Sequence, residues 1–331
     1  MLFRSGITAV GYKTLYSSTG ARNTAVGGGD DVTYNAALYS NTTGTDNAAF
    51  GIGTLGSNTT GAYNTALGVA ALYYSVTASN NTAVGFQAGY NTTGSNNTAF
   101  GGQALYSNTT GTYNTVSGYQ ALYGNTTGSY NVISGYGAGS AGSYNVAIGS
   151  LALTQNTASN NTAVGYQAAY TNTTGPKITA IGYQAAKLLN NGGPNFGDTM
   201  VGYNSGASVS TGIDNTFIGG QAGVSTTTGS TNVAVGSAAL YFNTSASNNT
   251  AVGYQAAYST TTGGTNVALG NGALYTNTTS SYNVMLGYNA GYTFNNTSSN
   301  YGDVYIGFQA GYSTNTGYNN IFIGEIGRAH V

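Results

Sequence analysis

The sequence predicts an all-β fold, a parallel β-solenoid of about 19 coils with about 17 residues in each. Three observations predict it. A glycine closes a short apolar stretch at a regular interval, most often 17 residues; side chains alternate with a period of two before that glycine; and Asn, Thr and Gly cluster between one stretch and the next. The recurring glycines are Gly11, Gly27, Gly51, Gly68, Gly85, Gly101, Gly118, Gly135, Gly149, Gly165, Gly182, Gly202, Gly219, Gly236, Gly253, Gly270, Gly287, Gly307 and Gly324.

The apolar stretch before each glycine is predicted to be a strand. Its pattern is Asn-[Thr/Val]-Ala-[Val/Ile/Leu/Phe]-Gly, in which two larger residues flank a small one. A period of two is typical of a strand, because successive side chains point to opposite faces. In "NVAIG" the alternation therefore places Val146 and Ile148 on one face, which we expect to be the inside of the coil, and Ala147 on the other.

The segment after each glycine, such as "GYQAAY" or "GGQALY", is predicted to be a second short strand. Gln, Ala and Leu also favour a helix, but only five or six residues lie between glycines, fewer than the ~12 that an isolated helix needs. The stretch "SNTTGSYN" that follows holds the residues that close turns. We therefore expect two strands and two turns in each coil.

Some segments of the repeat are identical in sequence. "ASNNTAVGYQAAY" occurs as residues 158–170 and again as 246–258. A single coil cannot bury enough apolar surface to fold alone, whereas stacked coils form ladders of identical side chains. Longer intervals surround residues 26–35, 188–198 and 293–303, which we predict to be loops that bulge from one face without breaking the stack.

Composition excludes several classes of function. The 331 residues include 53 Gly and 30 Tyr, no Cys, and only 4% charged residues. Six scattered Lys and Arg are too few for a nucleic-acid partner, which requires clustered positive charge. No apolar run is long enough for a membrane helix, so no membrane insertion is expected. Disorder is disfavoured because Val, Ile, Leu, Phe and Tyr recur in register.

The two ends of the chain do not follow the repeat. "MLFRS" (1–5) and "EIGRAHV" (325–331) both resemble translated sequencing adapters: GTG CTC TTC CGA TCT encodes the first, with GTG as start codon, and GAG ATC GGA AGA GCA CAC GTC encodes the second. We therefore interpret residues 6–324 as one solenoid domain. The only Glu, Glu325, and the only His, His330, then lie outside it.

No catalytic, cofactor-binding or metal site is predicted, and no enzymatic activity. A Ser-His-Asp or Cys-His set lacks its His or Cys, and the many Gly-x-Gly pairs lack the Lys and the helix of a phosphate-binding loop. Asp30 and Asp31 in "GGGDDVTYN" are adjacent and are interpreted as part of a solvated loop. The Asn-Thr-Thr sequons, which favour turn chemistry over glycosylation, are at Asn41, Asn58, Asn91, Asn108, Asn125, Asn172 and Asn277.

One family resemblance rests on the repeat itself. "YNVAIGS" (144–150) resembles the "SVAIG" signature in the head repeats of YadA-type trimeric autotransporter adhesins, and variants of it extend from Ile7 to Gly324. The repeat pattern "NTAVGYQAL…NTTG" is also similar to shaft repeats of phage tail fibres. The resemblance implies left-handed parallel β-rolls assembled as trimers on a bacterial surface. The repeat here is longer than the usual one, and its "YQALYSNTTG" half departs from the adhesin pattern.

These observations predict an adhesive or structural segment of an extracellular fibre that acts through multivalent contact. A homotrimer is expected because the middle strand residue, usually Ala, becomes Met200, Phe217, Met285, Tyr305 and Phe322, which would be exposed if they faced outward. The receptor, a host-surface protein or a glycan, is not identified by the sequence. A phage tail-fibre shaft is the alternative, and an ice-binding solenoid with ranked Thr is a minor one.

Overall fold

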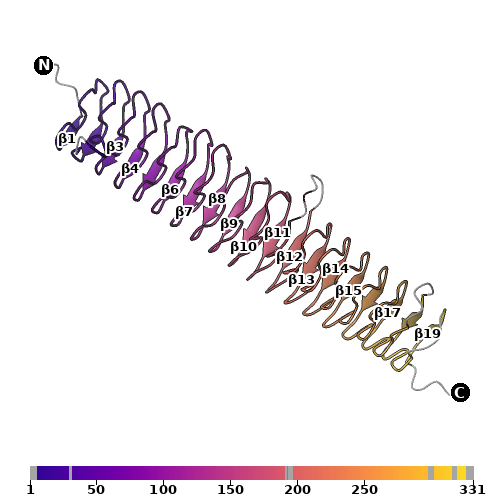
Figure 1. The fold of residues 1–331 in the computed structure, drawn as a ribbon. Coiled ribbons are helices and arrows are strands. Elements are labelled where there is room, and N and C mark those ends of the chain that lie inside the picture. Colours follow the sequence, from indigo (N-terminus) through magenta and orange to yellow (C-terminus); the bar gives the residue numbers. More distant parts are fainter. Residues whose placement is uncertain are drawn as a thin grey trace. The chain divides into compact units, whose positions relative to one another are not determined.

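The computed structural model describes residues 6–29, 32–190, 192, 197–296, 302–314 and 319–325. The chain divides into two compact units, residues 1–161 and 162–331. Each unit is a β-solenoid in which every repeat contributes one three-residue strand and a long series of turns (Figure 1). The predicted fold class is confirmed, and each of the nineteen recurring glycines directly follows a strand.

The strands of the first unit are β1 (Thr8–Val10), β2 (Thr24–Val26), β3 (Ala48–Phe50), β4 (Thr65–Leu67), β5 (Thr82–Val84), β6 (Thr98–Phe100), β7 (Thr115–Ser117), β8 (Val132–Ser134) and β9 (Val146–Ile148). Those of the second unit are β10 (Thr162–Val164), β11 (Thr179–Ile181), β12 (Thr199–Val201), β13 (Thr216–Ile218), β14 (Val233–Val235), β15 (Thr250–Val252), β16 (Val267–Leu269), β17 (Val284–Leu286), β18 (Val304–Ile306) and β19 (Ile321–Ile323).

Within each unit the strands stack in parallel and in register. In β6 and β7, for example, Thr98 lies opposite Thr115 and Ala99 opposite Val116. The register survives the longer intervals, because β2 pairs with β3, β11 with β12, and β17 with β18. The stack is therefore unbroken across these intervals, as predicted. Residues 30, 31, 191, 193–196 and 297–301 of the predicted loops lie outside the described residues.

The predicted inner face of the strand is wrong. Ala147 is fully buried, whereas Ile148 is 43% exposed and Val146 is only partly buried. Alternation correctly puts Val146 and Ile148 on one face, but that face is the outer one. The interior of a 17-residue coil is narrow, so its centre takes the small residue and the larger residues point outward.

The large residues at the middle of some strands consequently face inward, contrary to the prediction from which a trimer was argued. Met200, Phe217, Met285 and Tyr305 are fully buried within their own chain, and Phe322 is partly buried. Glycines on the opposite side of the coil accommodate them, as shown by the atoms that an added Cβ would meet. At Gly223 a Cβ would lie 2.3 Å from Cε2 of Phe217, and at Gly206 it would lie 2.4 Å from Sδ of Met200.

The predicted second strand is also wrong, because the segment after each glycine is a chain of turns. In "GYQAAY", Gln167 and Ala169 have φ of 52° and 49°, which is left-handed backbone that a strand excludes. The segment still bonds to the neighbouring coils: the Gln184 N–H donates to the Tyr166 carbonyl at 2.9 Å, and the Ala169 N–H donates to the Ala185 carbonyl at 2.9 Å. Stacking thus satisfies its backbone without extended geometry.

Glycine is required after the strand for two reasons, its positive φ and its short distance from the next coil. Gly118 has φ of 133°, and a Cβ there would lie 2.4 Å from the carbonyl oxygen of Gly135 in the next coil. Any larger residue would strain the backbone and push the coils apart. This close approach explains why glycine marks every repeat.

Candidate functional site

The described residues show no compact catalytic constellation, and they contain no cluster of three or more His, Cys, Asp or Glu that could hold a metal ion. Asp30, Asp31 and His330 lie outside the described residues, as do residues 1–5 and 326–331. The stacking instead places equivalent side chains of consecutive coils in rows along each unit.

A buried asparagine ladder forms one such row, before the strands. Nδ2 of Asn114 donates to Oδ1 of Asn97 at 3.1 Å and to the Gly128 carbonyl at 2.9 Å. Oδ1 of Asn114 in turn accepts from the backbone N–H of Asn131 at 3.1 Å and from its Nδ2 at 2.9 Å. The amide capacity of each member is largely used within the ladder, so its role is structural.

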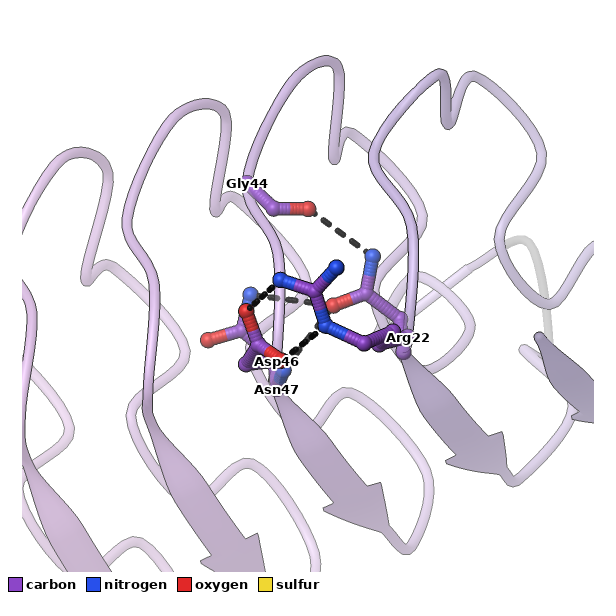
Figure 2. Close-up of polar contacts among 5 residues, drawn as sticks. Arg22, Gly44, Asp46 and Asn47 are labelled. Carbon is purple, nitrogen blue, oxygen red and sulfur yellow. Dashed lines mark hydrogen bonds and ion pairs between the residues drawn. The ribbon is translucent and has the colours of Figure 1, made fainter. Parts of the chain in front are cut away.

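Figure 2 shows the beginning of this ladder together with a surface ion pair. The backbone N–H of Asn47 donates to Oδ1 of Asn23 at 2.9 Å, and Nδ2 of Asn23 donates to the Gly44 carbonyl at 2.8 Å. Nε and Nη2 of Arg22 donate to the two carboxylate oxygens of Asp46 at 2.6 and 2.8 Å. This hydrogen bonding lowers the pKa of the Asp46 carboxyl and raises the pKa of Arg22.

Most of the sequon asparagines belong to a second buried row in each unit, in which Thr92 takes the place beside Asn91. Asn41, Asn58, Asn108, Asn125, Asn172 and Asn277 are fully buried, while Asn91 is partly buried. Nδ2 of Asn125 donates to the Gly128 carbonyl at 2.9 Å, and its Oδ1 accepts from the Gly128 N–H at 3.0 Å. The prediction that these residues serve turn chemistry is confirmed for the buried six, whose amides are not accessible to a glycosyl donor in the fold.

The outward strand residue next to the glycine is apolar in most coils and forms the outer apolar row, which Ser117 and Ser134 interrupt in the first unit. Leu67 is 50% exposed and Phe100 is 45% exposed. In the first unit the row comprises Val10, Val26, Phe50, Leu67, Val84, Phe100 and Ile148, and in the second Val164, Ile181, Val201, Ile218, Val235, Val252, Leu269, Leu286, Ile306 and Ile323. Thr is the commonest residue two positions earlier on the same outward face. Solvent-exposed apolar side chains repeated in this way mark an interaction surface.

Tyrosine rings form further rows along both units. In the first unit Tyr90, Tyr106 and Tyr123 stack with centroids 5.0 Å apart and planes within 7° of parallel. Tyr113, Tyr130 and Tyr144 form another row, with centroids 5.0 and 5.1 Å apart, and all three are exposed. Most ring faces are covered by the neighbouring rings, so the rows present ring edges and hydroxyl groups.

A glutamine ladder runs in the turn segment between strand and tyrosine row. Nε2 of Gln103 donates to Oε1 of Gln87 at 3.2 Å, and Nε2 of Gln120 donates to Oε1 of Gln103 at 2.9 Å. In the second unit, Gln184 donates to Gln167 at 2.8 Å. Sequence reasoning missed this ladder, although the recurrence of Gln two residues after the glycine was a visible signal.

The loop in the longest interval of the first unit reaches over these rows. The Tyr34 ring packs edge-on against Tyr73 at 5.6 Å, and its hydroxyl oxygen accepts a hydrogen bond from Nε2 of Gln87 at 3.0 Å. A pocket of about 110 Å³ lies beneath, lined by Val32, Thr33, Tyr34, Asn35 and Tyr73. The loop thus borders a small hollow, open to solvent, at one end of the glutamine and tyrosine rows.

Comparisons of the chain with protein-family models, with curated proteins and with solved structures found no match. The described part of the chain contains no helix with the length and apolar character needed to cross a membrane.

Proposed function

We propose that this protein is a structural and adhesive segment of an extracellular fibre, the head or shaft of a trimeric adhesin on a bacterial surface. The outer apolar row carries the proposal. It repeats in almost every coil on the outward face of the strands, where a single chain leaves it exposed. Burial of this row between copies of the chain would assemble the fibre, and the remaining rows would offer many identical contacts to a receptor.

The apolar area exposed beside the strands of the first unit is comparable to one face of a protein interface. Phe50, Ile52, Leu67, Phe86, Phe100, Tyr119, Tyr136 and Ile148 flank the first glycines of the coils and are 39–57% exposed. With roughly 150–250 Å² for a whole aromatic side chain, these eight leave on the order of 700 Å² to be covered. A standard protein interface buries about 800 Å² on each partner.

Sedimentation of the chain and of a Leu67→Lys/Phe100→Lys variant tests the proposal. We expect trimers for the parent and monomers for the variant, because two desolvated ammonium groups would oppose burial of the row. Tyr113→Lys/Tyr144→Lys is the matched control, since these tyrosines are similarly exposed but belong to another row, and Lys177 already occupies the equivalent left-handed position. A parent chain that remains a folded monomer would contradict the proposal.

A phage tail-fibre shaft is the second candidate, favoured by the same repeated outward face and the tail-fibre-like repeats. Sequencing of the DNA on both sides of this coding region separates the two. A virion-attachment module beside this segment would identify a tail fibre, whereas a stalk with an outer-membrane anchor would identify an adhesin.

A further inference from the structure

The strongest candidate for a binding site in the first unit is a strip of amides and phenols. We name Gln87, Gln103, Gln120, Tyr90, Tyr106 and Tyr123 the Gln–Tyr strip. Its members come from the turn segments that follow β5, β6 and β7 at equivalent positions of consecutive coils. All six side chains are partly exposed, so a ligand can reach both the amide row and the phenol row.

The amides of the strip retain hydrogen-bonding capacity. A glutamine amide has two N–H donors and two acceptor lone pairs. Within the ladder Gln103 uses one donor toward Gln87 and accepts one bond from Gln120. The central amide, Gln103, thus keeps a donor and an acceptor, which is the pair that vicinal sugar hydroxyls engage.

The phenols of the strip form a straight row with one hydroxyl in every coil. Ring planes deviate by only 4° between Tyr90 and Tyr106 and by 7° between Tyr106 and Tyr123. Partial burial raises the pKa of Tyr90 and of Tyr106, with a further contribution at Tyr90 from a hydrogen bond with Tyr74. These hydroxyls therefore stay protonated and able to donate throughout the neutral range.

The spacing of the strip selects the ligand. Consecutive rings are 5.0 Å apart, the interval of stacked β-coils. Extended β-1,4-linked hexose polymers advance by a nearly equal distance per sugar, and they are straight ribbons with hydroxyls along both edges. Alternate sugars are turned over, so identical contacts would recur at every second coil. An α-1,4-linked glucan curls and cannot follow a straight row.

Charge restricts the class further. The sequence contains no Asp, Glu, Lys, Arg or His between Asn47 and Pro176, a stretch that includes the whole strip. An acidic polysaccharide would find no counter-charge there, whereas a neutral one requires none. The pocket bordered by Tyr34 and Tyr73 lies at the end of the strip, because Tyr34 contacts Gln87 and Tyr73 stacks on Tyr90 at 5.6 Å.

We propose that the Gln–Tyr strip binds a neutral, extended β-1,4-linked polysaccharide with one sugar per coil and the chain end directed toward the Tyr34 pocket. This assignment rests on the proposed adhesive function for its biological use and adds to it the chemical class of the receptor.

Calorimetric titration of the full chain with cellohexaose and with chitohexaose tests the assignment. Maltohexaose is the control for linkage, and oligogalacturonate is the control for charge. We expect saturable binding of at least one β-linked hexamer, and at least tenfold weaker binding of both controls. A Tyr90→Phe/Tyr106→Phe/Tyr123→Phe variant keeps the stacked rings and removes the hydroxyls, and should weaken binding at least tenfold.

The matched control is Tyr113→Phe/Tyr130→Phe/Tyr144→Phe, which removes three hydroxyls from the other tyrosine row and should leave affinity unchanged. Circular dichroism verifies that both variants are folded. Failure of both β-linked hexamers to bind, equal binding of maltohexaose, or equal losses in the two triple variants would overturn the assignment. Sedimentation reads out the fibre proposal separately, so a trimer that binds neither hexamer would refute the ligand class alone.

Discussion

At the scale of single residues, stability depends on polar side chains that point inward and bond to the next coil. Asn97, Asn114 and Asn131 illustrate the arrangement, in which each side-chain oxygen accepts the backbone N–H of the following member. A buried N–H that loses its acceptor keeps the full cost of its desolvation. The asparagines are therefore as important to the interior as the apolar residues.

Replacement of Asn114 by Ala should destabilise the coil around it. The backbone N–H of Asn131 would lose its acceptor, whereas the Gly128 carbonyl keeps the hydrogen bond from Nδ2 of Asn125. We therefore expect a loss of about 1–3 kcal/mol for the one unsatisfied N–H group. Because a repeat array need not unfold in one step, hydrogen exchange of the Asn131 amide is the appropriate measurement. The exposed Thr126→Ala change serves as control; similar exchange in the two variants would contradict the importance of the ladder.

The tyrosine rows predict sensitivity to alkali. Burial raises the pKa of Tyr106, Tyr258 and Tyr292 above 10.0, their ordinary value. A pKa raised in the folded state gives stability that is complete below the unfolded pKa and is lost as pH rises through the folded pKa. We expect the urea midpoint to be constant up to about pH 9 and to fall above pH 10. In the Tyr90→Phe/Tyr106→Phe/Tyr123→Phe variant the urea midpoint should fall less steeply with pH. An equal slope in the parent and the variant would contradict tyrosine ionisation as the cause.

At the scale of one coil, the size of the strand's middle residue is matched to the residue opposite. Phe217 faces Gly223, and Met285 faces Gly291, where an added Cβ would lie 2.8 Å from the Met285 sulfur. In β14 the small Ala234 is followed by the buried Leu240. In these three coils a large residue at one position is thus paired with a small one at the other, as close packing requires. Ala163 and Ala169 are both small, so this exchange of sizes does not hold in every coil.

Exchanging the two sizes should preserve stability where single changes do not. Phe217→Ala should lower the free energy of unfolding by about 3–5 kcal/mol through cavity formation, and Gly223→Leu by at least about 1–3 kcal/mol through overpacking. The double variant Phe217→Ala/Gly223→Leu reproduces the pairing of the next coil and should recover most of the loss. Leucine is compatible with the left-handed backbone there, since Leu240 has φ of 51°. Additive losses in urea unfolding would refute the pairing.

At the scale of the whole molecule, the stack both stabilises each coil and leaves a strand edge at its last described coil. Within the described residues β19 pairs only with β18. Its outward residues Ile321 and Ile323 are 67% and 71% exposed. Apolar strand edges pair with other chains unless charge, proline or a cap blocks them.

A polar capping segment added after Gly324 should therefore raise the solubility of the 331-residue chain. The same cap inserted at residues 190–193, an internal interval, is the control and should have a smaller effect, because β11 and β12 on either side of it are already paired. Light scattering at increasing concentration measures the difference. Equal solubility of the two proteins would show that the β19 edge does not drive association.

The sequence by itself determined the repeat and the position of the one strand that each coil contains. These depend on local chemistry, the alternation of side chains and the turn residues. The reason for glycine after the strand is tertiary, because it lies in the close approach of the next coil, as at Gly118. The tertiary structure decided which face of the strand is inside, because a period of two is equally compatible with either face. It also decided that "GYQAAY" forms turns, since stacking satisfies its backbone in a left-handed conformation that isolated propensity disfavours. Phe217 and Gly223 are both visible in the sequence, but only the turns of the folded coil bring the two side by side in its interior.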